Sequence, residues 1–89
     1  MNIVVTFYCH CALCCGEADQ FTASGAWPRT KHTIAAPKWI SFGTKVVING
    51  ITYTVEDRTK SKRGWDIYVS SHSEALKLGR QKVNVTILP

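Results

Sequence analysis

The sequence predicts a small, mainly β barrel with one principal helix. Three observations lead to this prediction. Apolar residues alternate with other residues in several short runs, an Asn-Gly pair joins two of these runs, and one helix-capping sequence is present. With 89 residues the chain has room for one hydrophobic core, so we expect residues 1–89 to form a single domain.

The strands are predicted from alternation along the chain. A first strand covers residues 2–7, where Ile3, Val5 and Phe7 alternate with the residues between them. Residues 46–48 and 51–55 form a hairpin about Asn49-Gly50, because a type I′ turn needs positive φ at both central positions. Further strands are predicted over residues 65–69 and 83–87, and we expect six strands in the closed barrel.

One helix is predicted over residues 71–78. Ser71 and Glu74 have the spacing of a capping box, and Gly79 is placed to end the helix in the left-handed conformation. The expected apolar face consists of Ala75, Leu76 and Leu78. By contrast, residues 9–37 are interrupted by glycine and proline. We predict an irregular segment here, which either carries function or needs a stabilising cross-link.

The charge balance favours an anionic partner. Eleven basic residues against six acidic ones give a net charge of +5, which suits nucleic acid, an acidic polysaccharide or an anionic surface. Four of the positive charges lie within six residues: Arg58, Lys60, Lys62 and Arg63. A solvated basic loop is the simpler interpretation, and no aromatic residues are interleaved for base stacking, so we expect no nucleic-acid partner.

The sequence contains no membrane or export signal that we recognise. No apolar run approaches the roughly 20 residues that span a bilayer, and residues 3–7 are too short for the apolar part of a signal peptide. We therefore expect synthesis in the cytoplasm without an export signal, and a monomer with no membrane partner.

The four cysteines lie within seven residues: Cys9, Cys11, Cys14 and Cys15. Three interpretations stay open. The cluster is a structural zinc site, completed by His32 or His72; it is a pair of disulfides, if the chain reaches an oxidising compartment; or it is four reduced thiols. We expect no cofactor for catalysis, and we expect the cysteines to stabilise the long segment without contacting Asp66.

Asp66 is unexpected in an otherwise apolar strand, because burying a carboxylate costs free energy unless something binds it. One interpretation is that Asp66 pairs with Arg58 or Arg63, or faces solvent. The other is that burial raises the pKa of Asp66, so that it serves as a general acid.

A set of short motifs now identifies a resemblance. In order, they are Tyr8-Cys9, Cys14-Cys15-Gly16, Thr22-Ala23-Ser24-Gly25, Phe42-Gly43-Thr44-Lys45-Val46, Glu56-Asp57, Asp66-Ile67-Tyr68 and Ser71-His72-Ser73-Glu74-Ala75-Leu76. Together they resemble the 3D domain, named for three aspartates, which is related to the catalytic part of the membrane-bound lytic transglycosylase A family and to cell-wall muralytic factors. The resemblance covers residues 8–88.

The resemblance implies a double-psi β-barrel that cleaves the glycan strands of bacterial peptidoglycan. It implies that Asp57 matches the second family aspartate and that Asp66 matches the third, the catalytic acid. Phage-borne members of the family often lack an export signal, which fits this chain. The chain departs from the family at Ala36, where the first aspartate is expected, and in residues 58–64, which are shorter and more basic.

If the chain is such an enzyme, other side chains are expected to bind the substrate. Thr22 and Ser24 would donate hydrogen bonds to the sugar, Trp65 or Tyr53 would stack on a sugar face or belong to the core, and the basic loop with Arg58 would meet anionic groups of the wall. The alternatives are a barrel that binds glycan without cutting it, favoured by Ala36, and a zinc-stabilised module that binds nucleic acid.

Overall fold

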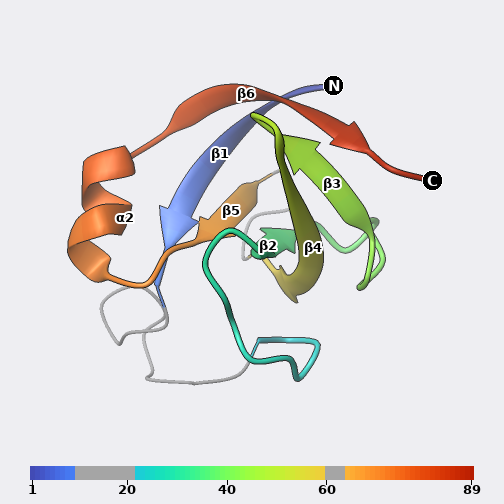
Figure 1. Ribbon diagram of the computed structural model, residues 1–89, viewed down its shortest axis with the longest axis horizontal. Helices are drawn as coiled ribbons and strands as arrows, with labels where there is room; N and C mark the ends of the chain where they lie inside the picture. The colour runs from blue at the N-terminus through green and yellow to red at the C-terminus, as the bar shows by residue number, and fades with distance from the viewer. Residues whose placement is uncertain (10–21, 60–63) are drawn as a thin grey trace.

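The computed structural model describes residues 1–9, 22–59 and 64–89. Within these residues six strands close into a barrel in the order β1-β5-β2-β4-β3-β6 (Figure 1). The elements are β1 (Asn2–Tyr8), β2 (Thr33–Ala36), β3 (Lys45–Ile48), β4 (Ile51–Arg58), β5 (Trp65–Tyr68), α2 (His72–Leu78) and β6 (Gln81–Ile87). The predicted mainly β barrel with one principal helix is therefore confirmed for the described part of the chain.

Two of the strand pairings are parallel and the others are antiparallel. β1 runs parallel to β5, and β2 runs parallel to β4. Figure 1 shows α2 on the left, where it carries the chain from β5 to β6 across the end of β1. No helix in the described ranges has the length and apolar character needed to cross a bilayer.

The interior of the barrel is filled by alternate residues of the strands. Ile34 of β2 pairs with Val55 of β4 on one side and with Ile67 of β5 on the other, and all three side chains are buried. The buried cluster consists of Val5, Ile34, Ala36, Ile40, Val46, Ile48, Tyr53, Val55, Trp65, Ile67 and Val85. Residues adjacent to these in each strand face outward, because successive side chains point to opposite faces.

The hairpin between β3 and β4 has the predicted turn. Ile48 pairs with Ile51, so the loop has only two residues. Asn49 and Gly50 have φ values of 52° and 78°, as a type I′ turn requires. This turn fixes the register that places Val46 and Tyr53 opposite each other.

The helix begins and ends where it was predicted, but the conformation of Gly79 and the apolar face differ. The Ser71 hydroxyl accepts a hydrogen bond from the Glu74 backbone N–H at 3.2 Å. Gly79 has a positive φ of 61°, yet its ψ of −127° lies outside the left-handed helical region. Ala75 is buried, whereas Leu76 is 70% exposed. Consecutive helical residues lie about 100° apart around the axis, and here Ala75 faces the barrel while Leu76 faces solvent.

One strand lies in the segment that was predicted to be irregular. β2 (Thr33–Ala36) is buried at every one of its four residues, so it is covered on both faces. A strand covered on both faces shows no alternation of apolar and polar residues, and four residues are too few to indicate a strand by length. The prediction of an irregular segment over residues 9–37 is therefore wrong for β2.

Candidate active site

Two aspartates face outward on either side of one small residue of β2. Ala35 pairs with Asp57 of β4 and also with Asp66 of β5. Residues directly opposite each other on neighbouring strands project to the same face of the sheet. Since Ile34, the residue before Ala35, points into the core, Ala35 and both aspartates point outward. The predicted pair of carboxylates is thus brought together across β2.

A shift in strand register turns Asp57 outward. Val55 pairs with Ile34, but Asp57 pairs with the very next residue, Ala35, so β4 has one extra residue here, Glu56. Regular alternation would place Asp57 on the same inner face as Val55. The bulge changes the direction of the side chain, as bulges beside functional sites commonly do.

Three hydrogen bonds from described residues hold the Asp57 carboxylate. Oδ2 accepts from the Tyr8 hydroxyl at 2.8 Å. Oδ1 accepts from the backbone N–H groups of Ala23 and Arg58, each at 2.9 Å. These partners come from β1, from the turn at residues 22–26 and from β4, so Asp57 ties three parts of the barrel together.

Asp66 lies in a groove on the outside of the barrel. The groove has a volume of about 580 Å³, and its lining includes Asp66, Thr6, Thr59 and Arg80. Burial raises the pKa of Asp66, and the negative charge of Asp57 raises this pKa further. Asp66 therefore keeps its proton to a higher pH than an ordinary aspartic acid, while the groove leaves the side chain accessible to a ligand.

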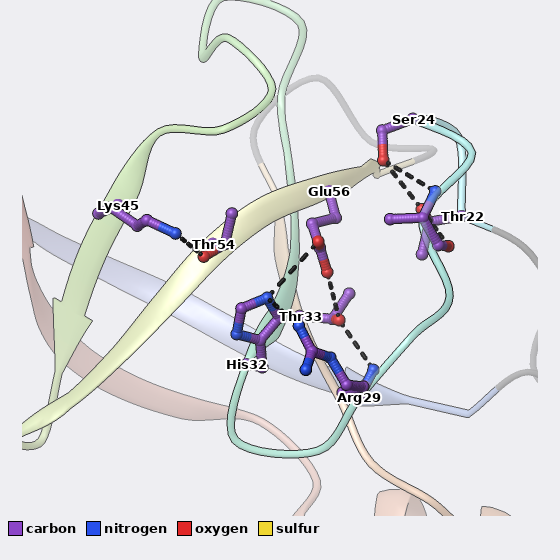
Figure 2. Close-up of polar contacts among 9 residues, drawn as sticks. Thr22, Ser24, Arg29, His32, Thr33, Lys45, Thr54 and Glu56 are labelled. Atoms are coloured by element: carbon purple, nitrogen blue, oxygen red, sulfur yellow. Dashed lines mark hydrogen bonds and ion pairs between the residues drawn. The ribbon is translucent and has the colours of Figure 1, made fainter.

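The bulge residue Glu56 is anchored to the first residue of β2 and to the residue before it, as Figure 2 shows. Glu56 Oε1 accepts from the Thr33 hydroxyl at 2.7 Å, and Oε2 lies 3.5 Å from Nε2 of His32. Thr33 in turn accepts from the Arg29 backbone N–H at 2.9 Å. The Glu56 carbonyl accepts from the backbone N–H of Ser24 at 3.0 Å. These contacts fix the bulge that directs Asp57.

Thr22 and Ser24 belong to the turn that contacts Asp57, but the contact is made by backbone. Thr22 is buried, and its hydroxyl donates to the Ala26 carbonyl at 2.9 Å (Figure 2). The hydroxyls of Thr22 and Ser24 lie 3.1 Å apart. The Thr22 proton is used inside the turn, and the hydrogen bond from Thr22 to a sugar stays a prediction. Ser24 is exposed beside the site.

The two aromatic residues expected to stack on a sugar are in the core instead. Tyr53 is 6% exposed and Trp65 is 2% exposed, and both belong to the buried cluster. Trp65 borders the groove, but its ring packs inward, edge to face with Trp39 at a centroid distance of 6.4 Å. Neither ring offers a face for stacking, so the core alternative holds for both.

Arg58 does not pair with Asp66 among the described contacts. Its guanidinium lies 3.9 Å above the ring of Phe42, a cation–π arrangement. Nη1 of Arg58 is buried and has no hydrogen-bond partner within the described residues. Arg63, the other basic residue considered as a partner of Asp66, lies outside the described residues.

The cysteine predictions are tested only at Cys9. This residue is buried directly after β1, and its Sγ lies 4.0 Å from Nδ1 of His72. His72 is therefore the histidine in contact with Cys9. Cys11, Cys14 and Cys15 lie outside the described residues, and the described residues contain no group of three or more side chains able to hold a metal.

Tyr8 and Ala35 belong to the candidate site, and sequence reasoning did not single out either of them for it. The alternation of the first strand could have indicated Tyr8, because it continues the outward series of Asn2, Val4 and Thr6. The role of Ala35 depends on pairing with two strands that are distant in sequence, and no local pattern reveals it.

In comparisons with known proteins, no family model matches the chain and no curated protein matches it significantly. Its function is therefore inferred from the groove and from the residues that surround the two carboxylates.

Proposed function

We propose that the protein is a lytic transglycosylase-like enzyme that cleaves the glycan strands of peptidoglycan, with Asp66 as general acid and then base. One observation carries the proposal: Asp66 lines an open groove while burial and the charge of Asp57 raise its pKa. Protonation of a glycosidic oxygen requires an accessible carboxylic acid that keeps its proton to a higher pH than an ordinary aspartic acid does.

In the proposed reaction Asp66 acts first as the general acid and then as the general base. Asp66 gives its proton to the glycosidic oxygen as the bond from that oxygen to the anomeric carbon breaks. The sugar's own 6-hydroxyl then attacks the anomeric carbon, and the Asp66 carboxylate takes the hydroxyl proton. Since the nucleophile belongs to the substrate, no second carboxylate needs to position a water molecule, unlike in the usual glycosidases. The product is a 1,6-anhydro sugar, and Asp66 is protonated again.

Asp57 supports this reaction without exchanging a proton. Its negative charge makes ionisation of Asp66 less favourable, and it also stabilises the positive charge of an oxocarbenium-like transition state. The hydrogen bonds from Tyr8, Ala23 and Arg58 fix the carboxylate, so little reorganisation is needed when that charge develops.

The resemblance to the 3D domain supports the proposal for the barrel topology and for the place where the enzyme acts. It implies a double-psi barrel, and the two parallel pairings, β1 with β5 and β2 with β4, support that topology. The same resemblance places the activity at the bacterial cell wall, in a phage-borne protein. The basic net charge of +5 agrees with a substrate that carries carboxylates.

The proposal is tested by the rate at which purified cell walls release soluble fragments. Asp66→Asn removes the proton donor and should lower this rate by a factor on the order of 10²–10⁴, the usual weight of general acid catalysis. Glu74→Gln is the matched control, because Glu74 is an exposed carboxylate on α2 and the rate should not change. An Asp66→Asn variant that cuts as fast as wild type refutes the assignment.

The second candidate is a barrel that binds glycan strands without cutting them. Ala36, at the position of the first family aspartate, is fully buried in the core and pairs with Arg58, so the site has two carboxylates instead of three. A wild-type protein that sediments with cell walls but releases no fragments would favour this function.

A further inference from the structure

The outer face of β1 forms a continuous track that leads away from Asp66. Asn2, Val4 and Thr6 point outward, because Ile3 and Val5 between them pack on the core. The first half of β1 pairs with β6 and the second half with β5. Asn2 lies opposite Asn84, Val4 opposite Lys82, and Thr6 opposite Asp66.

Two depressions of the surface lie along the outer face of β1 and share part of their lining. The groove that contains Asp66 also contains Arg80. A second depression of about 510 Å³ contains Lys82 and Asn84. Both are lined by Asn2, Ile3 and Val4, so they are parts of one hollow, which we call the β1 groove.

The β1 groove has the length of a site for a linear polymer. From Asn2 to Thr6 the strand advances four residues, or about 13 Å at the usual rise of a strand. The groove is open at the surface along this length, so a chain can lie in it and continue beyond it. Asp66 lies near one end, beside Thr6, and the Asn2–Asn84 pair lies at the other.

The charged side chains that line the β1 groove indicate which kind of polymer it binds. Arg80 directly precedes β6 and Lys82 is the second residue of β6. Both side chains are exposed, and each lines one of the two depressions. Among the described residues the only carboxylate that lines the β1 groove is Asp66, and burial and the charge of Asp57 raise its pKa. The track is therefore positive, apart from the group that protonates the substrate.

We infer that the β1 groove binds the glycan strand on one side of the bond that Asp66 cleaves, and that Arg80 and Lys82 bind the lactyl or peptide carboxylates of its muramic acid residues. This inference rests on the proposed function and names the part of the substrate that the site distinguishes. Charge-assisted hydrogen bonds from Arg80 and Lys82 select strands that carry acidic groups over uncharged sugar polymers.

The test measures binding in an Asp66→Asn background, so that the ligand is not consumed. The ligands are soluble peptidoglycan glycan strands and an uncharged oligosaccharide of N-acetylglucosamine, and affinity is measured by calorimetry. The Arg80→Ala/Lys82→Ala double variant should bind peptidoglycan strands about tenfold more weakly for each charge removed, and the uncharged oligosaccharide as before. Raising the salt concentration should weaken binding of the parent more than binding of the double variant.

Lys31→Ala/Lys38→Ala is the matched control. Both lysines are exposed and lie outside the β1 groove, so this variant has the same net charge as the first and should keep the parent's affinity. Melting temperatures establish that each variant is folded.

Three results overturn the inference. If the double variant binds peptidoglycan strands as tightly as the parent, the β1 groove is not the track, although Asp66-dependent cleavage by the otherwise wild-type chain leaves the proposed function intact. If the double variant loses affinity for a single-stranded oligonucleotide but not for the glycan, the groove binds nucleic acid. If the parent binds no glycan and the wild type cleaves none, the proposed function fails as well.

Discussion

At the scale of single residues, the candidate site depends on the placement of Asp57 and Asp66 on either side of Ala35. The methyl group of Ala35 is 2% exposed and is the only side chain of β2 between the paired positions. A larger side chain would fill the space between the carboxylates. The charge of Asp57 acts on Asp66 across this residue, and two measurements follow from that interaction.

The first measurement concerns stability. Because the pKa of Asp66 is raised above its ordinary 3.8, the folded protein binds this proton more tightly than the unfolded chain does. The stabilisation from Asp66 is complete below pH 3.8 and is lost as pH rises through the raised pKa. Asp66→Asn removes this dependence on pH. The melting temperature of the variant minus that of the wild type should therefore increase as pH rises from 3.8 through the raised pKa, and should then stay constant. A difference that is independent of pH would contradict the raised pKa.

The second measurement concerns the pH profile of cleavage. Asp57→Asn removes the negative charge but keeps the shape, and its oxygen can still accept from Ala23 and Arg58 while its amide donates to the Tyr8 hydroxyl. The pKa of Asp66 should fall, since one of its two causes is gone. The alkaline limb of the rate profile should therefore move to lower pH. An unmoved limb together with a lower maximum rate would mean that Asp57 acts only on the transition state.

At the scale of elements, the structure separates what local sequence determines from what pairing determines. The hairpin at Asn49-Gly50 and the start of α2 at Ser71 depend on a few consecutive residues, and sequence reasoning placed both. β2 and the bulge at Glu56 depend on strands distant in the sequence, and no local pattern indicated them. Asp66 was found because a carboxylate stands out in an apolar strand, whereas the groove beside it could not be predicted.

The helix offers a prediction with an internal control. Ser71→Ala removes the hydroxyl that accepts from the Glu74 N–H, and should lower the free energy of unfolding by about 1 kcal/mol. Leu76→Ala should change it by less than about 0.5 kcal/mol, because Leu76 is 70% exposed. Urea denaturation of both variants checks the pair. A larger loss at Leu76 than at Ser71 would mean that the apolar face of α2 is covered.

At the scale of the whole molecule, the chemical state of the cysteines can be measured through its effect on stability. Cys9 is buried beside His72, which agrees with a structural zinc site that uses this histidine but leaves the disulfide and thiol alternatives open. If zinc is bound, a chelator should lower the melting temperature by several degrees and His72→Ala should lower zinc content. If disulfides are present, a reductant should have this effect and the chelator none. Resistance to both treatments leaves reduced thiols.

In each of these cases cleavage by Asp66 is expected to need no metal. A chelated protein assayed below its lowered melting temperature should still release fragments from cell walls. Loss of cleavage while the protein remains folded would place the cysteines in the reaction, contrary to the proposed mechanism.

The most direct measurement of the central claim is the mass of the sugar end that cleavage produces. Purified peptidoglycan is digested with the wild-type protein and, in parallel, with Asp66→Asn, and the released muropeptides are analysed by mass spectrometry. The proposed mechanism predicts 1,6-anhydro ends with the wild type, one water lighter than hydrolysed ends, and none with Asp66→Asn. Reducing ends formed by addition of water, or equal release by the two proteins, would contradict it.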